Sequence, residues 1–503
     1  MAKYKQTDTE NGQGLFLSVN LKEQLIPGTF EYMLDDLIEN KIDVSIFDKN
    51  YKNDETGAAA IPPPALIKLI IYGYSKGVKS SRGIEELGKN NITAKAPARD
   101  IEPRWTTIAG FISGNSEMFK DVFVKVLTYC AELGLIGGQT FAVDGCRIPS
   151  NASMSLSGTA EELRKKLNVY RRMAEKHIAR HQKKDRNGET DEKTEKNYQR
   201  RQKHLNRQIE KISIFLENIE QKEGKRGKEI KSNVTDNESA VILSSSGYIQ
   251  GYIGIAVSDS KNQVIISAQA AGSANECEHL PRIVDDAMEN IQAAAVETPG
   301  GTKRTLLADK NYFSEENLKA CEEREIEAII PDSQYKRRLG ENKEMRYEAG
   351  DFIYHEEGNY YECPQGKPLL YCGESTLSGV EGKAYQARAK DCRVCPCFTR
   401  CIRSKKEQGV IDKGRKIMIT ESNKSGSLCA ALRKKLNSEE YQERYAYRIQ
   451  IIEPVFANIT YCKGLKRFTL RGREKVNGQW RLYCMMHNLG KCLKEYNKKK
   501  GYM

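Results

Sequence analysis

The sequence has no long hydrophobic run. None of its stretches reaches the roughly 18 apolar residues that a membrane-spanning helix requires. The first residues, MAKYKQTDTENGQG, lack the apolar centre of a secretory signal. Both absences predict a cytoplasmic protein with no membrane partner. In that compartment the 14 cysteines are expected to be reduced thiols, not disulfides.

Several signatures of catalysis are also missing. The six histidines are scattered, and none stands at ligand spacing from a pair of cysteines. No Ser–His–Asp or Cys–His set is recognisable, and no glycine-rich phosphate-binding loop follows an apolar run. These absences argue against a triad hydrolase and against a doubly wound nucleotide-binding fold.

Positive charge, by contrast, is abundant and unevenly distributed. The 503 residues carry a formal net charge of +13. Residues 159–231 hold 22 Lys and Arg against 13 Asp and Glu, and residues 463–503 hold 12 against 2. Such basic clusters are typical of proteins that bind a polyanion. For 159–231 a solvated charged face explains the pattern equally well, whereas 463–503 interleaves Phe468, Trp480 and Tyr483 with its cations and favours nucleic acid.

Hydrophobic periodicity divides the chain into helical and β-rich stretches. Residues 15–135 place apolar side chains at helical spacing, whereas residues 139–145 form a strand-like apolar run. Two β-rich runs, 245–259 and 263–272, are joined by the turn DSKN. Farther along, the pattern alternates helix, strand, helix and strand. Together these signals predict a mixed sheet covered by helices.

Residues 159–231 interrupt this sheet pattern. Apolar positions recur there at alternating spacings of four and three, first from Leu163 to His177 and again from Leu205 to Ile219. A polar stretch, KKDRNGETDE, separates the two series. This repeat predicts an antiparallel hairpin of two helices that share a narrow apolar seam.

Three acidic residues stand in settings that suit metal chemistry. Asp144 ends the apolar run in TFAVDG, Asp309 ends that in RTLLADKNY, and Glu453 lies in the helix-like stretch EEYQERYAYRIQIIEPVFANI. Carboxylates at strand ends can hold Mg²⁺ or Mn²⁺ beside solvent. Two such ions clamp the attacking and leaving oxygens of a phosphodiester reaction. Strand-end aspartates are also common turn formers. The flanking residues are therefore needed to distinguish a metal ligand from a turn former.

The segment that carries Glu453 has its own start and break signals. The residues NSEE predict a capping box, in which Asn437 and Glu440 exchange hydrogen bonds at the helix start. Pro454 follows Glu453 directly and is expected to kink the helix or to end its regular part. Such a kink would aim Glu453 toward the sheet.

The residues around these acids resemble a known family. The resemblance is to bacterial insertion-sequence transposases with an RNase H-like DDE core, in the group with a Cys-rich insertion before the last acid. It is carried by AVDGCRIPSNAS (142–153), ADKNYFSEENL (308–318) and, at 451–493, IIEPVFANI…GLKRFTLRGREKV…WRLYCMMHNLGKCL. The N-terminal domain of that family is similar to LIKLIIYGYSKGVKSSRGIEELGKNN, which starts at residue 66. In all, the resemblance spans about residues 15–495.

This resemblance implies a DNA transposase of the bacterial nucleoid. Such an enzyme binds the ends of an insertion sequence, cleaves them and joins them to target double-stranded DNA. The resemblance implies that Asp144, Asp309 and Glu453 are catalytic and hold two Mg²⁺ or Mn²⁺ ions for transesterification. A homo-oligomer is expected, because two ends must be joined together. The residues expected to bind DNA are Lys310, Arg448, Lys463, Arg467, Arg471, Arg473 and Lys475.

Departures from the family pattern keep an alternative open. Asn311 stands where the family usually has Gly, and Thr460 stands where it has an end-binding Lys, for which Lys463 is the candidate substitute. One extra residue also separates Arg448 from Glu453. The alternative is a domesticated, catalytically inactive protein that still binds DNA.

Six cysteines are clustered in one segment: Cys363, Cys372, Cys392, Cys395, Cys397 and Cys401. Cys392 and Cys395 form a C-x-x-C knuckle of the kind that binds structural Zn²⁺. Cys363 and Cys401 are expected to complete the site, by position and by the family resemblance, with Cys372 and Cys397 as alternates. A Cys-rich loop without metal is the competing interpretation.

The predicted fold is an α/β RNase H-like mixed-sheet core with an N-terminal all-helical domain, a helical hairpin insertion and a Cys-rich insertion. The N-terminal domain is expected to bind DNA, and the Cys-rich insertion to bind zinc. The predicted boundaries are 1–135 for the helical domain, 136–158 for the start of the core, 159–231 for the hairpin, 232–334 for the rest of the core, 335–425 for the Cys-rich insertion, and 426–503 for the last catalytic helix with the basic C-terminal segment.

Overall fold

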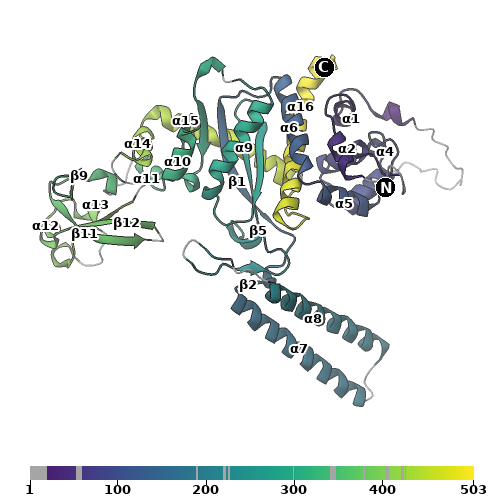
Figure 1. Cartoon of the computed structure of the whole chain (residues 1–503), viewed down its shortest axis with the longest axis horizontal. Coiled ribbons are helices and arrows are strands. Elements are labelled where there is room, and N and C mark those ends of the chain that lie inside the picture. Colours follow the sequence, from purple (N-terminus) through teal and green to yellow (C-terminus); the bar gives the residue numbers. More distant parts are fainter. Residues whose placement is uncertain are drawn as a thin grey trace, which may run out of the picture. The chain divides into compact units, whose positions relative to one another are not determined.

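The chain forms two compact units in its computed structural model, and Figure 1 shows their helices and strands. The structure describes residues 20–51, 59–187, 191–218, 222–224, 227–297, 299–339, 347–377, 380–402, 407–420, 424 and 426–502. One unit ends at Phe111 and includes the chain from Leu493 onward, and the other is Ile112–Cys492. The first 19 residues of the predicted N-terminal domain lie outside the described residues.

The first unit is helical, as predicted. It contains η1 (Leu21–Gln24), α1 (Phe30–Asn40), η2 (Ser45–Asn50), α2 (Pro63–Ser75), α3 (Ser81–Asn90), α4 (Ile92–Lys95) and most of α5 (Trp105–Gly114). Pro63 occupies the first position of α2. An N–H at that position has no acceptor within the helix, so the lack of one in proline costs no hydrogen bond. The residues of α2 from Ala65 to Tyr74 are all buried, which makes this apolar helix the centre of the unit.

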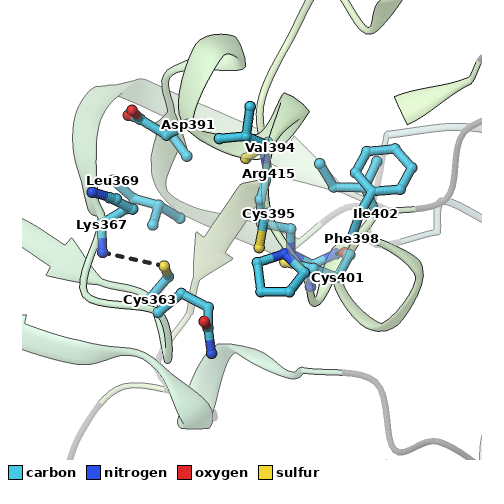
Figure 2. A pocket seen from close by; sticks show the side chains of 14 residues that line it. Cys363, Lys367, Leu369, Asp391, Val394, Cys395, Phe398, Cys401, Ile402 and Arg415 are labelled. Carbon is cyan, nitrogen blue, oxygen red and sulfur yellow. Dashed lines mark hydrogen bonds between the residues drawn. The ribbon is translucent and has the colours of Figure 1, made fainter. Parts of the chain in front are cut away.

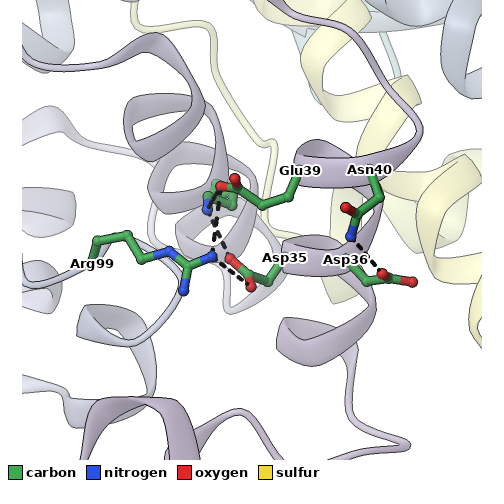
Figure 3. A network of polar contacts seen from close by, with 6 residues as sticks. Asp35, Asp36, Glu39, Asn40 and Arg99 are labelled. Carbon is green, nitrogen blue, oxygen red and sulfur yellow. Dashed lines mark hydrogen bonds and ion pairs between the residues drawn. The ribbon is translucent and has the colours of Figure 1, made fainter.

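Lys68 is the exception in that apolar helix, since it is charged and only 1% exposed. Its Nζ lies 2.7 Å from Asp35 and 2.6 Å from Glu39, both on α1. Arg99 adds a second cation 3.2 Å from Asp35 (Figure 3). A buried ammonium is tolerated only where such partners satisfy it. The network therefore fixes how α1 packs on α2.

A six-stranded mixed sheet forms the centre of the second unit. Its strands are β1 (Thr140–Pro149), β4 (Ala240–Ser244), β5 (Gly247–Asp259), β6 (Ile265–Ala271), β7 (Arg304–Ala308) and β8 (Ile326–Ile329). β1 is antiparallel to β5 and parallel to β7, and β8 continues in parallel beyond β7. β4 and β6 pair in antiparallel with the other edge of β5. The mixed sheet is confirmed, although β4 was not predicted.

The helices and short turns of this unit are α6 (Met118–Glu132), η4 (Cys277–His279), α9 (Leu280–Ala293), η5 (Pro299–Gly301), η6 (Lys310–Tyr312), α10 (Glu315–Glu322), α11 (Tyr335–Arg338), α14 (Leu428–Lys435), α15 (Glu439–Ala457), the π-turn η9 (Asn458–Cys462) and α16 (Arg473–Lys500), which extends past the unit. α9 contacts β5 and β6, whereas α15 contacts β1, β5 and β7. The boundary between the two units lies between Phe111 and Ile112, before α6. The predicted helical domain 1–135 therefore includes α6, which belongs to the second unit.

Trp480 of α16 packs on the sheet at a glycine. A Cβ on Gly254 of β5 would lie 3.2 Å from its ring, so a larger residue there would push the indole outward by a few tenths of an ångström. The Trp480 Nε1 donates to Ile255 O at 3.0 Å, which satisfies the buried indole. The aromatic residues of the basic C-terminal segment are thus core residues: Phe468, Trp480 and Tyr483 are all fully buried. They stabilise the fold and present no ring to a nucleic acid.

Residues between β1 and β4 form the predicted helical hairpin. α7 (Ala160–Arg186) and α8 (Glu192–Asn218) lie side by side (Figure 1), between η3 (Met154–Leu156) with β2 (Ser157–Gly158) and β3 (Ser232–Asn233). Their seam buries Leu163, Leu167 and Ile212, as the alternating spacing predicted. None of the described helices combines the length and the apolarity needed to cross a membrane.

The Cys-rich segment contains a small antiparallel sheet that was not predicted. Its strands are β9 (Ile353–His355), β10 (Tyr360–Glu362), β11 (Pro368–Leu377), β12 (Val380–Ala387) and β13 (Lys416–Ile419), accompanied by η7 (Ala349–Asp351), α12 (Ala389–Arg393), α13 (Phe398–Cys401) and η8 (Gln408–Val410). The strands pair in the order β13-β12-β11-β10-β9. A core that includes Tyr361, Leu369 and Tyr385 lies on this sheet, and three cysteines pack against it.

Candidate active site

Asp144 and Asp309 lie at neighbouring positions of two parallel strands. The β1–β7 ladder ends at the pair Val143 and Ala308, so each aspartate is the next residue beyond it. Asp144 is partly buried, and its Oδ1 accepts a hydrogen bond from Gly145 N at 2.8 Å. Asp309 begins the turn η6. This register explains why two acids that are far apart in sequence lie at the same end of two neighbouring strands.

Helix α15 adds the third acid together with an arginine. Arg448 Nη1 lies 2.9 Å from Asp144 Oδ2, and its Nη2 lies 3.9 Å from Glu453 Oε1. Arg448 is only 8% exposed, whereas the Glu453 side chain is 56% exposed. The guanidinium thus joins two of the three predicted catalytic acids.

Contacts with β7 and β8 hold α15 on the sheet. Arg444 forms an ion pair with Glu327 of β8 and donates to Thr305 Oγ1 at 3.0 Å, and Tyr441 also donates to Glu327.

The predicted capping box is wrong, because Ser438 rather than Asn437 precedes the first helical residue and no side chain caps the helix.

Pro454 does not end the helix, which continues to Ala457 before the π-turn. A proline has no N–H to give to the carbonyl four residues earlier, here that of Gln450. Gln263, in the turn between β5 and β6, supplies the missing donor: its Nε2 lies 2.8 Å from Gln450 O. The helix can therefore pass through the proline and keep Glu453 at the site.

A fourth carboxylate, Glu276, lies beside the acids and was missed by sequence reasoning. It is 4% exposed, and its Oε1 lies 3.2 Å from Arg147 Nη2. Burial, and next the charge of Asp144, raise its pKa to about 7. Burial also raises the pKa of Asp144, against the lowering effect of Arg448. The sequence does place Glu276 at a position suited to a site, in ECEH between a strand and a helix. With 68 Asp and Glu residues in the chain, however, many acids occupy such positions, and this one could not be singled out.

The acidic side chains are not arranged as a finished metal site. Among the residues that the structure describes, no three His, Cys, Asp or Glu side chains are arranged to hold one ion. At the acids, Arg448 pairs with Asp144 and approaches Glu453, so these acids have a cationic partner within the protein. The donor set, carboxylate oxygens at the edge of a buried sheet, is nevertheless the kind that Mg²⁺ and Mn²⁺ prefer.

Four of the six clustered cysteines line one pocket: Cys363, Cys392, Cys395 and Cys401. Figure 2 shows the pocket, with Cys363 and Cys395 turned into it. Backbone N–H groups point at two of the sulfurs, since Lys367 N lies 3.3 Å from Cys363 Sγ and Arg415 N lies 3.4 Å from Cys392 Sγ.

The two alternate cysteines differ from these four. Cys372 is exposed on β11, and Cys397 accepts a hydrogen bond from Tyr347 Oη at 3.6 Å. Neither lines the pocket.

Burial raises the pKa of Cys401 to about 11 and also raises that of Cys392. Without a cation these thiols therefore keep their protons at neutral pH, and binding of a metal would have to displace them.

Two of the predicted DNA-binding arginines tie the basic segment to the end of β1. Arg467 Nε donates to Ser150 O at 2.8 Å, and Arg471 Nε donates to Asn151 O. Both arginines are exposed, so each guanidinium keeps a solvent-facing side. These bonds connect the basic segment to the strand that carries Asp144.

The other predicted DNA-binding residues are Lys310, Arg448, Lys463, Arg473 and Lys475. Lys310 is exposed next to Asp309, Arg473 and Lys475 are exposed in the first turn of α16, and Lys463 is half-buried. Arg448 differs from them, because it is buried against Asp144 and faces the acids, not solvent.

Comparison with protein families gives two matches. Residues 362–493, which include Glu453 and the four pocket cysteines, match the family described as "Transposase DDE domain". Residues 19–113 match the family described as "Transposase domain (DUF772)". Asp144 and Asp309 lie outside both matched segments. No curated protein matches the chain.

Proposed function

The chain belongs to the insertion-sequence DDE transposases, and we propose that it cleaves the ends of its element and joins them to target DNA at Asp144, Asp309 and Glu453. The observation that carries this proposal is the meeting of the β1 and β7 strand ends with α15, where Arg448 contacts two of the three acids. The inactive DNA-binding alternative is not favoured, because both family matches are to transposase domains.

The strand order supports an RNase H-like core. β6, β5, β1, β7 and β8 follow one another across the sheet, antiparallel on one side of β1 and parallel on the other. In this interpretation the helical hairpin is an insertion between β1 and β4, and the Cys-rich segment is an insertion between β8 and α15. Neither insertion separates the strands of the sheet from one another or the three acids from one another.

Asp144, Asp309 and Glu453 would hold two Mg²⁺ or Mn²⁺ ions, which supply a polarised nucleophile and a stabilised leaving oxygen. The remaining work falls to the protein. Arg448 pairs with Asp144, and it would have to give way for that carboxylate to hold a cation. Lys310 stands next to Asp309, where a scissile phosphate would lie, and the basic segment after Glu453 is in position to hold the DNA backbone.

DNA contact is assigned mainly to the exposed cations of residues 463–503 and to the helical first unit. Phosphate contacts of this kind position a duplex without reading its sequence. Two element ends have to be joined, so the active form is proposed to be a homo-oligomer that holds two duplexes.

We also propose a structural Zn²⁺ held by Cys363, Cys392, Cys395 and Cys401. All four line one pocket, which Cys372 and Cys397 do not, and this favours these four as the ligands. The N–H donors of Lys367 and Arg415 would stabilise thiolates there, as hydrogen bonds around metal sites commonly do. The ion would join the end of β10 to α12 and α13, which are short elements.

The experiment uses full-length protein and a linear duplex that contains the end of its own element. With Mg²⁺ or Mn²⁺ the protein should cut at the element end, and with EDTA it should not. End-specific cutting that persists in EDTA, or its absence with both metals while the end is bound, would contradict the proposed reaction.

A further inference from the structure

The residue that follows Glu453 interrupts the hydrogen-bond ladder of α15. Pro454 has no N–H, and a proline ring inside a helix crowds the carbonyl four positions earlier. That carbonyl belongs to Gln450, so the ladder lacks one bond within a turn of the proposed catalytic acid. An internal proline ordinarily kinks or ends a helix, yet α15 continues to Ala457. A group outside the helix therefore has to support this turn.

The support comes from the turn between β5 and β6. Gln263 Nε2 donates to Gln450 O at 2.8 Å, which replaces the bond that Pro454 cannot make. The other end of the same amide is also held, because Lys491 Nζ of α16 donates to Gln263 Oε1 at 2.8 Å. An ammonium group can only donate, so the amide oxygen has to face α16 and the amide N–H groups have to face α15.

The backbone of Gln263 is strained in a way that its side chain explains. Its φ is 61°, in the left-handed region that residues with a side chain seldom occupy. Glycine would adopt this conformation at no steric cost. A glutamine is less stable there, and such strain indicates that the side chain itself is needed at this position.

The turn that carries Gln263 is anchored to the start of β1. Asp259, the last residue of β5, is fully buried and accepts hydrogen bonds from Gly137 N and Gly138 N, each at 2.9 Å. These glycines lead into β1, the strand of Asp144. The support of α15 is thus fixed to the strand that carries the first acid.

His487 of α16 extends the support to the other side of Pro454. It is buried, its Nε2 lies 3.0 Å from Gln263 O, and its Nδ1 lies 3.2 Å from Asn458 Oδ1. Asn458 begins the π-turn η9, directly after α15. The helix is therefore held before the proline through Gln450 and after it through Asn458, and both contacts lead back to Gln263.

We propose that Gln263 is a positioning residue for strand cleavage: its side chain replaces the hydrogen bond lost at Pro454 and so holds Glu453 at the acid site. This inference rests on the proposed function, because it takes Glu453 to be catalytic. Gln263 acts through the helix and not on the DNA. The register of β1 and β7 places the first two acids, and the turn between β5 and β6 places the third.

The competing explanation is that Gln263 only stabilises its turn. The two are separated by measuring, on full-length protein, Mg²⁺-dependent cleavage and binding of a duplex that carries the element end. Gln263→Gly removes the side chain and relieves the backbone, whereas Gln263→Glu keeps the size and the partner Lys491 but cannot donate to Gln450 O. Asn262→Ala is the matched control, because that amide donates from the same turn to Leu135 O at 2.9 Å, outside α15.

Both Gln263 variants should bind the element end with nearly unchanged affinity but cut it about 10- to 100-fold more slowly, because a misplacement of about 1 Å can cost about 100-fold. Asn262→Ala should cut at the unmodified rate. Gln263→Gly should melt close to the temperature of the unmodified protein, since relief of the backbone offsets the lost hydrogen bonds. If it fails to fold, Gln263→Glu takes its place throughout.

Pro454→Ala separates positioning from turn stability. It restores an N–H that can donate to Gln450 O, so the helix no longer needs the Gln263 side chain. The double variant of Gln263→Gly with Pro454→Ala should therefore cut at nearly the rate of Pro454→Ala alone, as expected for two residues that act on one hydrogen bond. A role confined to the turn predicts no such rescue.

Cleavage at the unmodified rate by both Gln263 variants would overturn this inference, and so would a double variant that stays as slow as Gln263→Gly. Equal slowing by Asn262→Ala would also overturn it, in favour of the structural role. Glu453→Gln is measured alongside. If it loses cleavage, the proposed function stands whatever the Gln263 variants do. If it cuts at the unmodified rate, the proposed function is rejected and this inference with it.

Discussion

Arg448 Nη1 lies 2.9 Å from Asp144 Oδ2, so an arginine of α15 forms an ion pair with the acid of β1. A divalent cation that binds Asp144 has to compete with this guanidinium. The ion pair keeps the partly buried acid satisfied and keeps the helix of Glu453 against the sheet. In the proposed reaction, arginine and metal would therefore be alternative partners of one carboxylate.

Arg448→Met should uncouple these two roles. Breaking a buried pair leaves the Asp144 charge without a partner, so stability in EDTA should fall by up to about 3–5 kcal/mol. Mn²⁺ should then raise the melting temperature of Arg448→Met more than that of the unmodified protein, because the ion takes over from the guanidinium. Arg444→Met, which breaks the ion pair with Glu327 on the same helix, is the control. An equal effect of Mn²⁺ on both variants would count against competition at Asp144.

Zinc content tests the cysteine assignment. Gently purified protein should contain about one Zn²⁺ per chain by mass spectrometry. Cys363→Ser and Cys392→Ser should lose it, because each removes a thiolate from the shared pocket. Cys372→Ser and Cys397→Ser, outside the pocket, should keep it. A metal-free protein, or equal loss in all four variants, would reject the site.

The salt dependence of DNA binding tests the basic segment. Arg473 and Lys475 are the clearest pair to neutralise, because Arg467 and Arg471 also bind backbone carbonyls of the fold. Changing both to Gln should reduce the slope of log affinity against log salt by about 2, since each phosphate contact contributes about 0.9. An unchanged slope, with a reduced slope after neutralising Lys183 and Lys184 of the hairpin, would move DNA binding to α7.

The buried Lys68 network tests the packing of the first unit. Lys68→Ala leaves Asp35 and Glu39 facing a cavity, and it should destabilise the unit by about 3–5 kcal/mol in urea unfolding. Arg99→Ala removes a cation whose side chain is 45% exposed, so its cost should stay below about 1 kcal/mol. Equal costs for the two variants would show that burial of Lys68 contributes little.

The arrangement of the core was predictable because its strands carry strong local signals. β5 and β6 are buried along most of their length and are separated by a polar turn, and Asp309 closes an apolar strand. The hairpin was predictable for the same reason, since a narrow seam such as Leu163, Leu167 and Ile212 repeats at helical spacing.

What the sequence did not reveal depends on contacts between distant residues. The burial of Glu276 follows from its approach to Gly145 and Arg147, 129 positions away in the case of Arg147. The strands of the small sheet around the cysteines expose apolar residues, such as Ile353 and Leu370, so their sequences lack a clear alternation of apolar and polar residues. The helix cap shifted from Asn437 to Ser438, because cap positions are decided by the local backbone and not by residue type alone.

Strand cleavage by the three acid variants tests the central claim most directly. End-labelled duplex carrying the element end is incubated with Mg²⁺ and with unmodified protein, Asp144→Asn, Asp309→Asn, Glu453→Gln or the control Glu327→Gln. The proposed reaction predicts that the first three variants bind the end with nearly normal affinity but cut it about 100- to 1,000-fold more slowly, the loss expected for a group that stabilises the transition state. Glu327→Gln should still cut. End-specific cleavage by Asp309→Asn at the unmodified rate would contradict the assignment.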